Sequence, residues 1–312
     1  MALKSLVLHL GAHKTGTSLI QKFIRDNAEL CADAGVASIL RSETDRIIGW
    51  GRSREIDAGK QDLRQYIDSA DKSGFSYFVL SHENALGRPF DAQKGATRLY
   101  PYGLGRAKTL RAALEGYPIK VIYYFRSAAA FVESYYLQTI HEGDYTPFKT
   151  WRRNTGRPSL SWGPVYEDLC EVFGAECVTP KVFNSEIALG QEAFLEAFFS
   201  TFMDPAPNPS AFNNFYYAPV RNSSIGEKGL EIALAANPLL SSGSERKLMR
   251  KFLQANFSNL THSRASLLGD SKIAQIADTF RDDIPDIMAR HGCAGSEEKV
   301  ATADAVACDG QG

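Results

Sequence analysis

The sequence is poor in the features of disulfide-linked, metal-binding and membrane-spanning proteins. Its 312 residues include five cysteines and six histidines, and the cysteines form no Cys-x-x-Cys pair. Because five cysteines leave one over in any disulfide scheme, we expect reduced thiols and no metal centre. No apolar run approaches the roughly 18 residues that a membrane span requires.

The chain also lacks a strong charge of either sign. Its net charge of −1 argues against a general nucleic-acid binder, which would carry a basic excess. With 44% hydrophobic and 23% charged residues, the composition is that of a soluble enzyme with a substantial core, and it indicates no oligomeric state. Residues 1–10 are too short, and too soon followed by a glycine loop, to read as a signal peptide, so we expect a cytoplasmic protein.

The most informative stretch is a glycine-containing loop between an apolar run, residues 4–10, and an amphipathic helix expected from residue 17. Glycines let the backbone approach an anion, and the amides at the helix N-terminus favour negative charge. A lysine adds a full charge, and three hydroxyl groups add donors. The candidate anion-binding residues of the loop are His13, Lys14, Thr15, Gly16, Thr17 and Ser18.

The position of the lysine argues against an ordinary ATP or GTP loop. A Walker A loop has its lysine directly after the second glycine. Here Gly11 and Gly16 keep the glycine spacing, but Thr17 occupies the lysine position and the lysine lies at residue 14. The loop therefore indicates phosphate binding of a different kind.

A second candidate element joins a strand to a helix. Residues 118–126 are β-branched and aromatic and end in Arg126, and residues 127–141 have a helical period. Ser134 then lies about two turns into the helix. Taken alone, Arg126 could equally be a salt-bridge partner.

A third element places polar groups at a strand end, where open α/β sheets bind ligands. Residues 75–80 form a short apolar strand that runs into Ser81, His82, Glu83 and Asn84. Both Glu83 and His82 are candidates for a general base, because a carboxylate can accept a proton and an imidazole titrates near neutrality.

Together these elements resemble sulfotransferases that use 3′-phosphoadenosine 5′-phosphosulfate (PAPS), in their bacterial and glycan-type branch. Lys-Thr-Gly-Thr-Ser is similar to their 5′-phosphosulfate loop, and Glu83 resembles their catalytic base. Arg126 and Ser134 match the arginine and serine, eight residues apart, that hold the 3′-phosphate in that family. The turn departs from the family, which commonly has Asp-Pro where this chain has Ser127-Ala128.

A looser match concerns a late segment. Arg221 precedes a predicted helix, where many family members have a loop that folds over the cofactor. On this resemblance we expect Arg221 to contact the cofactor, although it could equally be a surface arginine.

The resemblance implies transfer of a sulfuryl group from PAPS to an acceptor hydroxyl, or to an amine, with adenosine 3′,5′-bisphosphate as product. Lys14 would act on the leaving phosphate and Glu83 on the acceptor proton. The alternatives are a kinase-like phosphoryl transferase, which would need Mg²⁺ ligands, and a nucleotide-binding module without chemistry. A glycan or glycolipid acceptor is one interpretation of the tryptophans and arginines near Trp50 and Trp151–Trp162; surface loops anchored by aromatics are the other.

Alternating strands and helices predict an α/β fold, a parallel sheet flanked by helices with the site at its carboxyl edge. The resemblance implies the sulfotransferase variant of the P-loop nucleotide-kinase fold. We expect one domain over residues 1–293, helix-rich from residue 225 to about 290, and a disordered tail over residues 294–312. Further helices are expected at the ranges 17–34, 60–72, 104–115, 164–173 and 191–202, and a strand at 177–183. Polar, irregular stretches are expected over 41–58 and 143–163.

Overall fold

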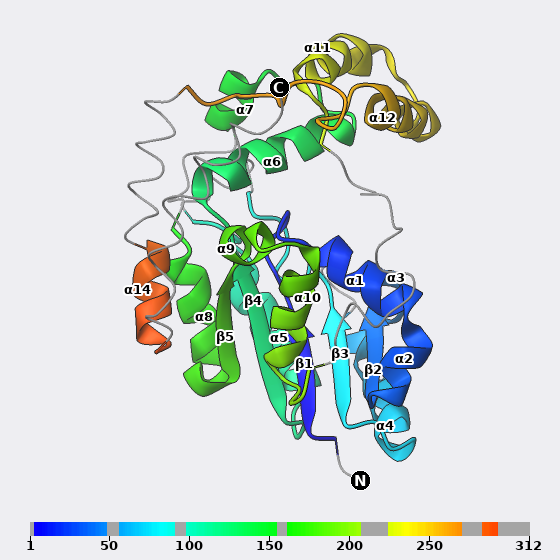
Figure 1. The fold of residues 1–312 in the computed structure, drawn as a ribbon, viewed down its shortest axis with the longest axis vertical. Coiled ribbons are helices and arrows are strands. Elements are labelled where there is room, and N and C mark those ends of the chain that lie inside the picture. Colours follow the sequence, from blue (N-terminus) through cyan, green and yellow to red (C-terminus); the bar gives the residue numbers. More distant parts are fainter. Residues whose placement is uncertain are drawn as a thin grey trace.

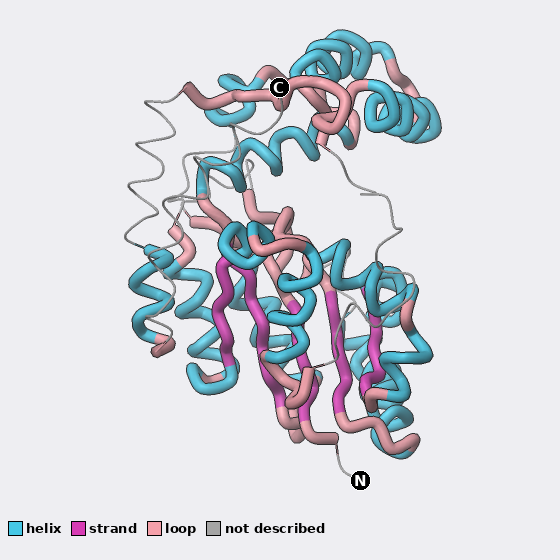
Figure 2. The backbone as a smooth tube through the Cα atoms, viewed as in Figure 1, coloured by secondary structure: helices cyan, strands magenta, loops and turns pink. Residues whose placement is uncertain are grey.

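The computed structural model describes residues 3–48, 56–90, 98–154, 161–206, 224–269 and 283–292. Its centre is a five-stranded parallel sheet of order β2-β3-β1-β4-β5, with helices around it (Figures 1 and 2). The predicted α/β class is therefore confirmed. The strands are β1 (Ser5–His9), β2 (Val36–Leu40), β3 (Tyr77–Ser81), β4 (Ile119–Phe125) and β5 (Val178–Val182).

The central strands are buried on both faces, as parallel strands in α/β proteins are. Leu8 of β1 lies opposite Leu80 of β3 on one side and Val121 of β4 on the other, and all three are fully buried. Because β1 lies between β3 and β4, the carboxyl ends of these three strands meet at one edge. The three candidate elements of the sequence follow these strand ends.

Alternate strand residues face two separate cores. Leu6 and Leu8 share one core with helices α4 (Ile56–Lys72), α5 (Gly103–Ala113) and α8 (Gly163–Phe173). Val7 points into the other core, with α1 (Thr17–Asp26), α2 (Ala28–Asp33) and α10 (Gln191–Ser200). The sheet is therefore covered on both faces and open only at its edges.

A group of helices stands over the carboxyl edge of the sheet (Figure 1). It comprises α6 (Ala128–His141), α7 (Phe148–Asn154), α11 (Glu227–Ala236) and α12 (Gly243–Asn256). We call α11, the short helix η4 (Asn237–Leu239), α12 and residues 257–269 the C-terminal lobe; α11 packs on α6. The remaining helices include α9 (Phe183–Ala188), directly after β5, and α14 (Asp283–Arg290), against α8. Within the described ranges, no helix combines the length and apolar character needed to cross a bilayer.

Several predicted boundaries were wrong for local reasons. The helix expected over 17–34 is divided at Asn27, whose side-chain amide donates to the Phe23 carbonyl at 2.9 Å and ends α1. No strand was expected at residues 36–40, which form β2. The polar stretch expected over 41–58 begins with a helix, α3 (Arg41–Ile48). Unlike β1 and β3, β2 is an edge strand whose centre is Ala37-Ser38, so no continuous apolar run indicates it.

The predicted irregular stretch 143–163 contains α7, and α9 was not expected. The continuous helical character expected from residue 225 is interrupted, because residues 257–269 form a loop whose backbone bridges back to the start of α11, with Gly226 N donating to the Phe257 carbonyl at 2.7 Å. The predicted tail, Arg221 and Trp50 lie outside the described residues.

The attachment of the C-terminal lobe to α6 generates a stability prediction. The buried Asn237 side chain donates to the Ile140 and Asp144 carbonyls, both at 2.8 Å. Asn237→Ala removes both bonds and leaves the Asp144 carbonyl without this donor, while the Ile140 carbonyl still accepts from the Gly143 N–H, so we expect the free energy of unfolding in urea to fall by about 2 kcal/mol. The matched control is Asn256→Ala, which removes one exposed bond to the Phe252 carbonyl and should change stability by less than about 0.5 kcal/mol. Equal effects of the two substitutions would contradict the assigned role.

Candidate functional site

The loop between β1 and α1 turns through two left-handed residues, Lys14 (φ 67°) and Gly16 (φ 78°). At Gly16 a Cβ would lie 2.8 Å from Phe194 Cζ and 2.9 Å from Phe183 Cε2, so only glycine fits. Helix α1 begins at the next residue, Thr17, and its first N–H groups have no intrahelical acceptor. The turn therefore presents free amides and the positive end of a helix dipole to the carboxyl edge of the sheet.

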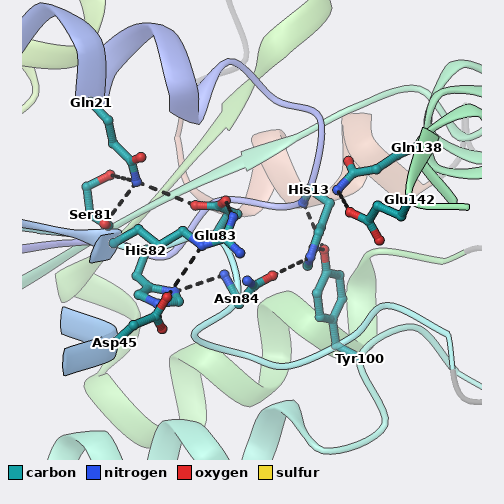
Figure 3. Close-up of polar contacts among 11 residues, drawn as sticks. His13, Gln21, Asp45, Ser81, His82, Glu83, Asn84, Tyr100, Gln138 and Glu142 are labelled. Atoms are coloured by element: carbon teal, nitrogen blue, oxygen red, sulfur yellow. Dashed lines mark hydrogen bonds and ion pairs between the residues drawn. The ribbon is translucent and has the colours of Figure 1, made fainter. Parts of the chain in front are cut away.

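His13 shapes the loop from inside. Its backbone N–H donates to the Tyr100 hydroxyl at 3.0 Å, and its Nδ1 lies 3.0 Å from the same hydroxyl. Its Nε2 lies 2.7 Å from Asn84 Oδ1, so the neutral ring carries its proton on Nε2 and accepts from Tyr100. Burial lowers the pKa of His13 to about 4. Both ring nitrogens are therefore engaged by protein groups (Figure 3).

Two cations meet at the loop. Arg126, directly after β4, donates from Nη1 to the Lys14 carbonyl at 2.7 Å. Burial and the positive charges of Arg126 and Arg250 lower the pKa of Lys14 to about 8. Burial and the charge of Arg264 lower the pKa of Arg126 to about 10. Depressed pKa values in cations indicate positive charge that the protein itself does not fully compensate, which favours an anionic ligand.

Buried donors without partners point to the same conclusion. Among the described residues, Thr17 Oγ1 and Arg126 Nε are buried and have no hydrogen-bond partner. An unpaired buried donor costs about 1–3 kcal/mol, and a ligand oxygen would remove that cost. The Thr15 hydroxyl, in contrast, donates to the Ala12 carbonyl at 2.6 Å and stabilises the turn. Ser18 is exposed at the start of α1.

At the end of β3, the two candidate bases have different surroundings (Figure 3). The fully buried His82 accepts from the Asn84 N–H at Nδ1 (3.1 Å) and contacts Asp45 Oδ1 through Nε2 (2.8 Å). Glu83 pairs with Arg41 of α3 through Oε1, and its Oε2 lies 3.4 Å from Gln21 Nε2.

These surroundings set the charge of each group. Burial lowers the pKa of His82 despite its bond to Asp45. Burial by itself would raise the pKa of Glu83, but Arg41 and nearby hydrogen bonding hold it below the ordinary value. At neutral pH, Glu83 is therefore a carboxylate and His82 a neutral ring with both nitrogens occupied.

The structure brings most of the predicted residues to one region. Ser134 lies buried on α6, eight residues after Arg126 as the sequence indicated. Its neighbour Glu133 accepts from the Leu267 and Leu268 N–H groups at 2.9 and 3.2 Å, which fixes the loop of the C-terminal lobe beside α6. Arg221 lies outside the described residues.

Sequence reasoning missed three arginines. Arg41 was part of a stretch read as polar and irregular, and it holds Glu83. Arg250 and Arg264 come from the C-terminal lobe, more than 100 residues after the loop that they approach. Nothing near them in the sequence resembles a motif, so only the packing of the lobe reveals them.

Comparisons with known proteins add little. No family model matches the chain, and no curated protein matches it. Among solved structures, the chain is similar to a sulfotransferase from Alicyclobacillus acidocaldarius, with 14% sequence identity and a TM-score of 0.40 over 85% of this chain and 98% of that one. A similarity this weak supports no argument about function. Within the described ranges, no three His, Cys, Asp or Glu side chains gather where they could hold a metal ion.

The buried histidines generate a prediction about pH. Burial lowers the pKa values of His9, His13 and His141 from 6.5 to about 4. The unfolded chain therefore binds protons that the folded chain does not, and stability is lost as the pH falls from 6.5 towards 4. We expect the free energy of unfolding in urea to fall by up to about 4 kcal/mol per pH unit between pH 6 and 5.

The control is His9→Gln, which should reduce the slope of stability against pH by about one proton. A free energy of unfolding that stays constant from pH 7 to 5 would show that these rings are not buried in their neutral form.

Proposed function

We propose that this protein is a sulfotransferase that moves the sulfuryl group of PAPS to the hydroxyl of an acceptor. The observation that carries the proposal is the gathering of Lys14 and Arg126, with unpaired donors beside them, at a helix N-terminus. Such a site suits a ligand with several anionic groups, and PAPS carries about four negative charges near neutral pH.

The donor would lie along the loop. The amides of residues 14–18, the Lys14 ammonium and the Thr17 hydroxyl are suited to the 5′ side. Arg126 and Ser134 are suited to the 3′-phosphate, and Arg264 adds a cation there, because its Nη2 lies 3.9 Å from Oε2 of Glu133, next to Ser134. The predicted contacts His13, Thr15 and Gly16 would shape the loop rather than bind through their side chains. We keep Arg221 as a predicted contact.

The chemistry would be an in-line transfer. Glu83 accepts the proton of the acceptor hydroxyl while a bond forms between that oxygen and sulfur. The bond from sulfur to the 5′-phosphate oxygen breaks, and its electron pair stays on the phosphate. Lys14 and the loop amides neutralise that charge, and each such donor is commonly worth roughly 3 kcal/mol in the transition state. The products are the sulfated acceptor and adenosine 3′,5′-bisphosphate.

The hydrogen bonds favour Glu83 over His82 as the base. To accept a proton, His82 would have to give up either the Asn84 N–H or Asp45. Glu83 is ionised, and its neighbour Asn84 contacts His13 in the loop, which puts this strand end beside the donor site. Arg41 then acts as a positioning residue that keeps one carboxylate oxygen oriented.

The nature of the acceptor is less constrained. Two of the three tryptophans that suggested a glycan are unsuited to stacking on a sugar, because Trp162 is fully buried and Trp151 is 5% exposed; Trp50 lies outside the described residues. Trp162 instead donates to the Arg126 carbonyl at 2.9 Å and supports the strand end. We therefore propose a hydroxylated acceptor. We also propose that residues 1–293 form one catalytic domain.

Nucleotide affinity tests the donor. By calorimetry, adenosine 3′,5′-bisphosphate should bind at least about tenfold tighter than ADP, with or without Mg²⁺, because charge-assisted bonds hold its 3′-phosphate. Arg264→Ala should reduce that preference without disturbing the loop, since this side chain is 65% exposed. Arg126→Ala should abolish the preference. Equal affinities for the two nucleotides in the parent protein, or tighter binding of ATP that requires Mg²⁺, would favour the phosphoryl-transferase alternative.

A second prediction separates the candidate bases. Glu83→Gln keeps the shape of the side chain and removes its basicity, so turnover of PAPS should fall by about 10² to 10⁴ while bisphosphate affinity stays near the parent value. His82→Asn should slow turnover much less and mainly lower stability, because it disrupts a buried contact with Asp45. The opposite ranking of the two turnover rates would assign the proton transfer to His82.

A further inference from the structure

A buried histidine at the end of α6 has no role in the site described so far. His141 is 9% exposed, and its Nε2 has no hydrogen-bond partner among the described residues. Burial lowers its pKa to about 4, so the ring is neutral at physiological pH. An unpaired polar atom at such a position is costly to folding and indicates a function that the ligand-free structure does not satisfy.

Helix α12 of the C-terminal lobe places an arginine against the turn that follows this histidine. The side chain of Arg246 packs against Gly143, where an added Cβ would lie 2.5 Å from Arg246 Cδ, and its Nη2 donates to the Leu240 carbonyl at 3.4 Å. Arg250 lies one helical turn later on the same face and is half-buried. The packing of Arg246 therefore directs Arg250 towards the end of α6.

Arg250 and Lys14 both lie close enough to His141 for their charges to affect it. Both cations lower the pKa of His141, and Arg250 lowers that of Lys14. The carboxylate of Glu142 offsets part of this field and is held by Gln138 Nε2 at 2.9 Å. Arg250 makes no ion pair with any residue that the structure describes.

We propose that His141 and Arg250, together with Lys14, bind the sulfuryl group of the donor and stabilise its oxygens during transfer. The inference rests on the proposed function. The charge of Arg264 affects the pKa of Arg126, whereas that of Arg250 affects the pKa values of Lys14 and His141. Because Arg126, Ser134 and Arg264 are assigned to the 3′-phosphate in the proposed function, His141 and Arg250 are suited to the anion at the 5′ end. That anion is the sulfuryl group, and it is absent from the bisphosphate product.

The chemistry suits these side chains. A neutral imidazole can donate from Nε2 to one sulfuryl oxygen, and a guanidinium can bridge two oxygens. Lys14 contacts the bridging oxygen, where the bond from sulfur to the phosphate oxygen breaks, while His141 and Arg250 hold the oxygens that stay with sulfur. These contacts would guide the sulfuryl group towards the acceptor oxygen opposite the leaving phosphate.

The test compares donor with product. Calorimetry measures the affinities of Arg250→Ala and His141→Leu for PAPS and for adenosine 3′,5′-bisphosphate, and sulfate release measures slow transfer to water. We expect PAPS affinity to fall by about tenfold, bisphosphate affinity to stay within about twofold, and sulfate release to fall by about 10²-fold. Arg250→Lys should recover part of the loss because it keeps the charge.

The matched control is Lys251→Ala, which removes one positive charge from the exposed face of the same helix and should change neither affinity. Equal losses for PAPS and bisphosphate would overturn the inference, because the contact would then be with a nucleotide phosphate. Parent-like PAPS binding and sulfate release in Arg250→Ala and His141→Leu would also overturn it, and a lowered melting temperature alone would assign both residues to α6 packing. Failure of the parent protein to prefer the bisphosphate over ADP would instead refute the proposed function, and the inference with it.

Discussion

Positive charges held close together in a partly buried site are the constraint on which the rest of this structure depends. Lys14 and Arg126 repel each other, and Arg250 and Arg264 add to the repulsion. The protein opposes it with hydrogen bonds that fix the backbone: Arg126 holds the Lys14 carbonyl at 2.7 Å, and Trp162 holds the Arg126 carbonyl at 2.9 Å. Because these bonds join the ends of β1 and β4, the rigidity of the sheet keeps the cations in place before any ligand arrives.

Buried polar contacts between the C-terminal lobe and α6 also hold the cations of the lobe in place. Glu133 of α6 accepts from the backbone N–H groups of Leu267 and Leu268, and Asn237 donates to the end of the same helix. Both contacts join residues more than 90 positions apart through buried polar groups. A polyanion that bridges the loop and the lobe would relieve the repulsion between the cations of the two parts. Binding of such a ligand and packing of the lobe on α6 would therefore be coupled, because each would favour the other.

The features that the sequence could predict are those that local rules determine. The strand, loop and helix from Ser5 to Asp26 could be predicted because they consist of a buried strand, a glycine with positive φ and an amphipathic helix. The strand end at Arg126 could be predicted for the same reason. The proximity of Arg250 and His141 to Lys14, and of Arg264 to Arg126, could not be predicted, because it depends on how the C-terminal lobe packs on α6 and no local pattern records that packing. The role of His13 was also hidden, since its partners, Asn84 and Tyr100, are 71 and 87 residues away.

Glu83, at the end of β3, contacts other residues than those whose charges affect Lys14. Its partners are Arg41 and Gln21, whereas the charges that affect Lys14 come from β4, α6 and α12. In the proposed reaction, a carboxylate in direct contact with Lys14 would neutralise the ammonium that acts on the leaving phosphate. Held by α3 instead, Glu83 stays ionised without forming that ion pair. His13, next to Lys14 in the chain, and Asn84, next to Glu83, are bonded to each other at 2.7 Å. In the proposed reaction, this neutral pair would join the loop of the leaving-group cation to the strand end of the proton acceptor without pairing their charges.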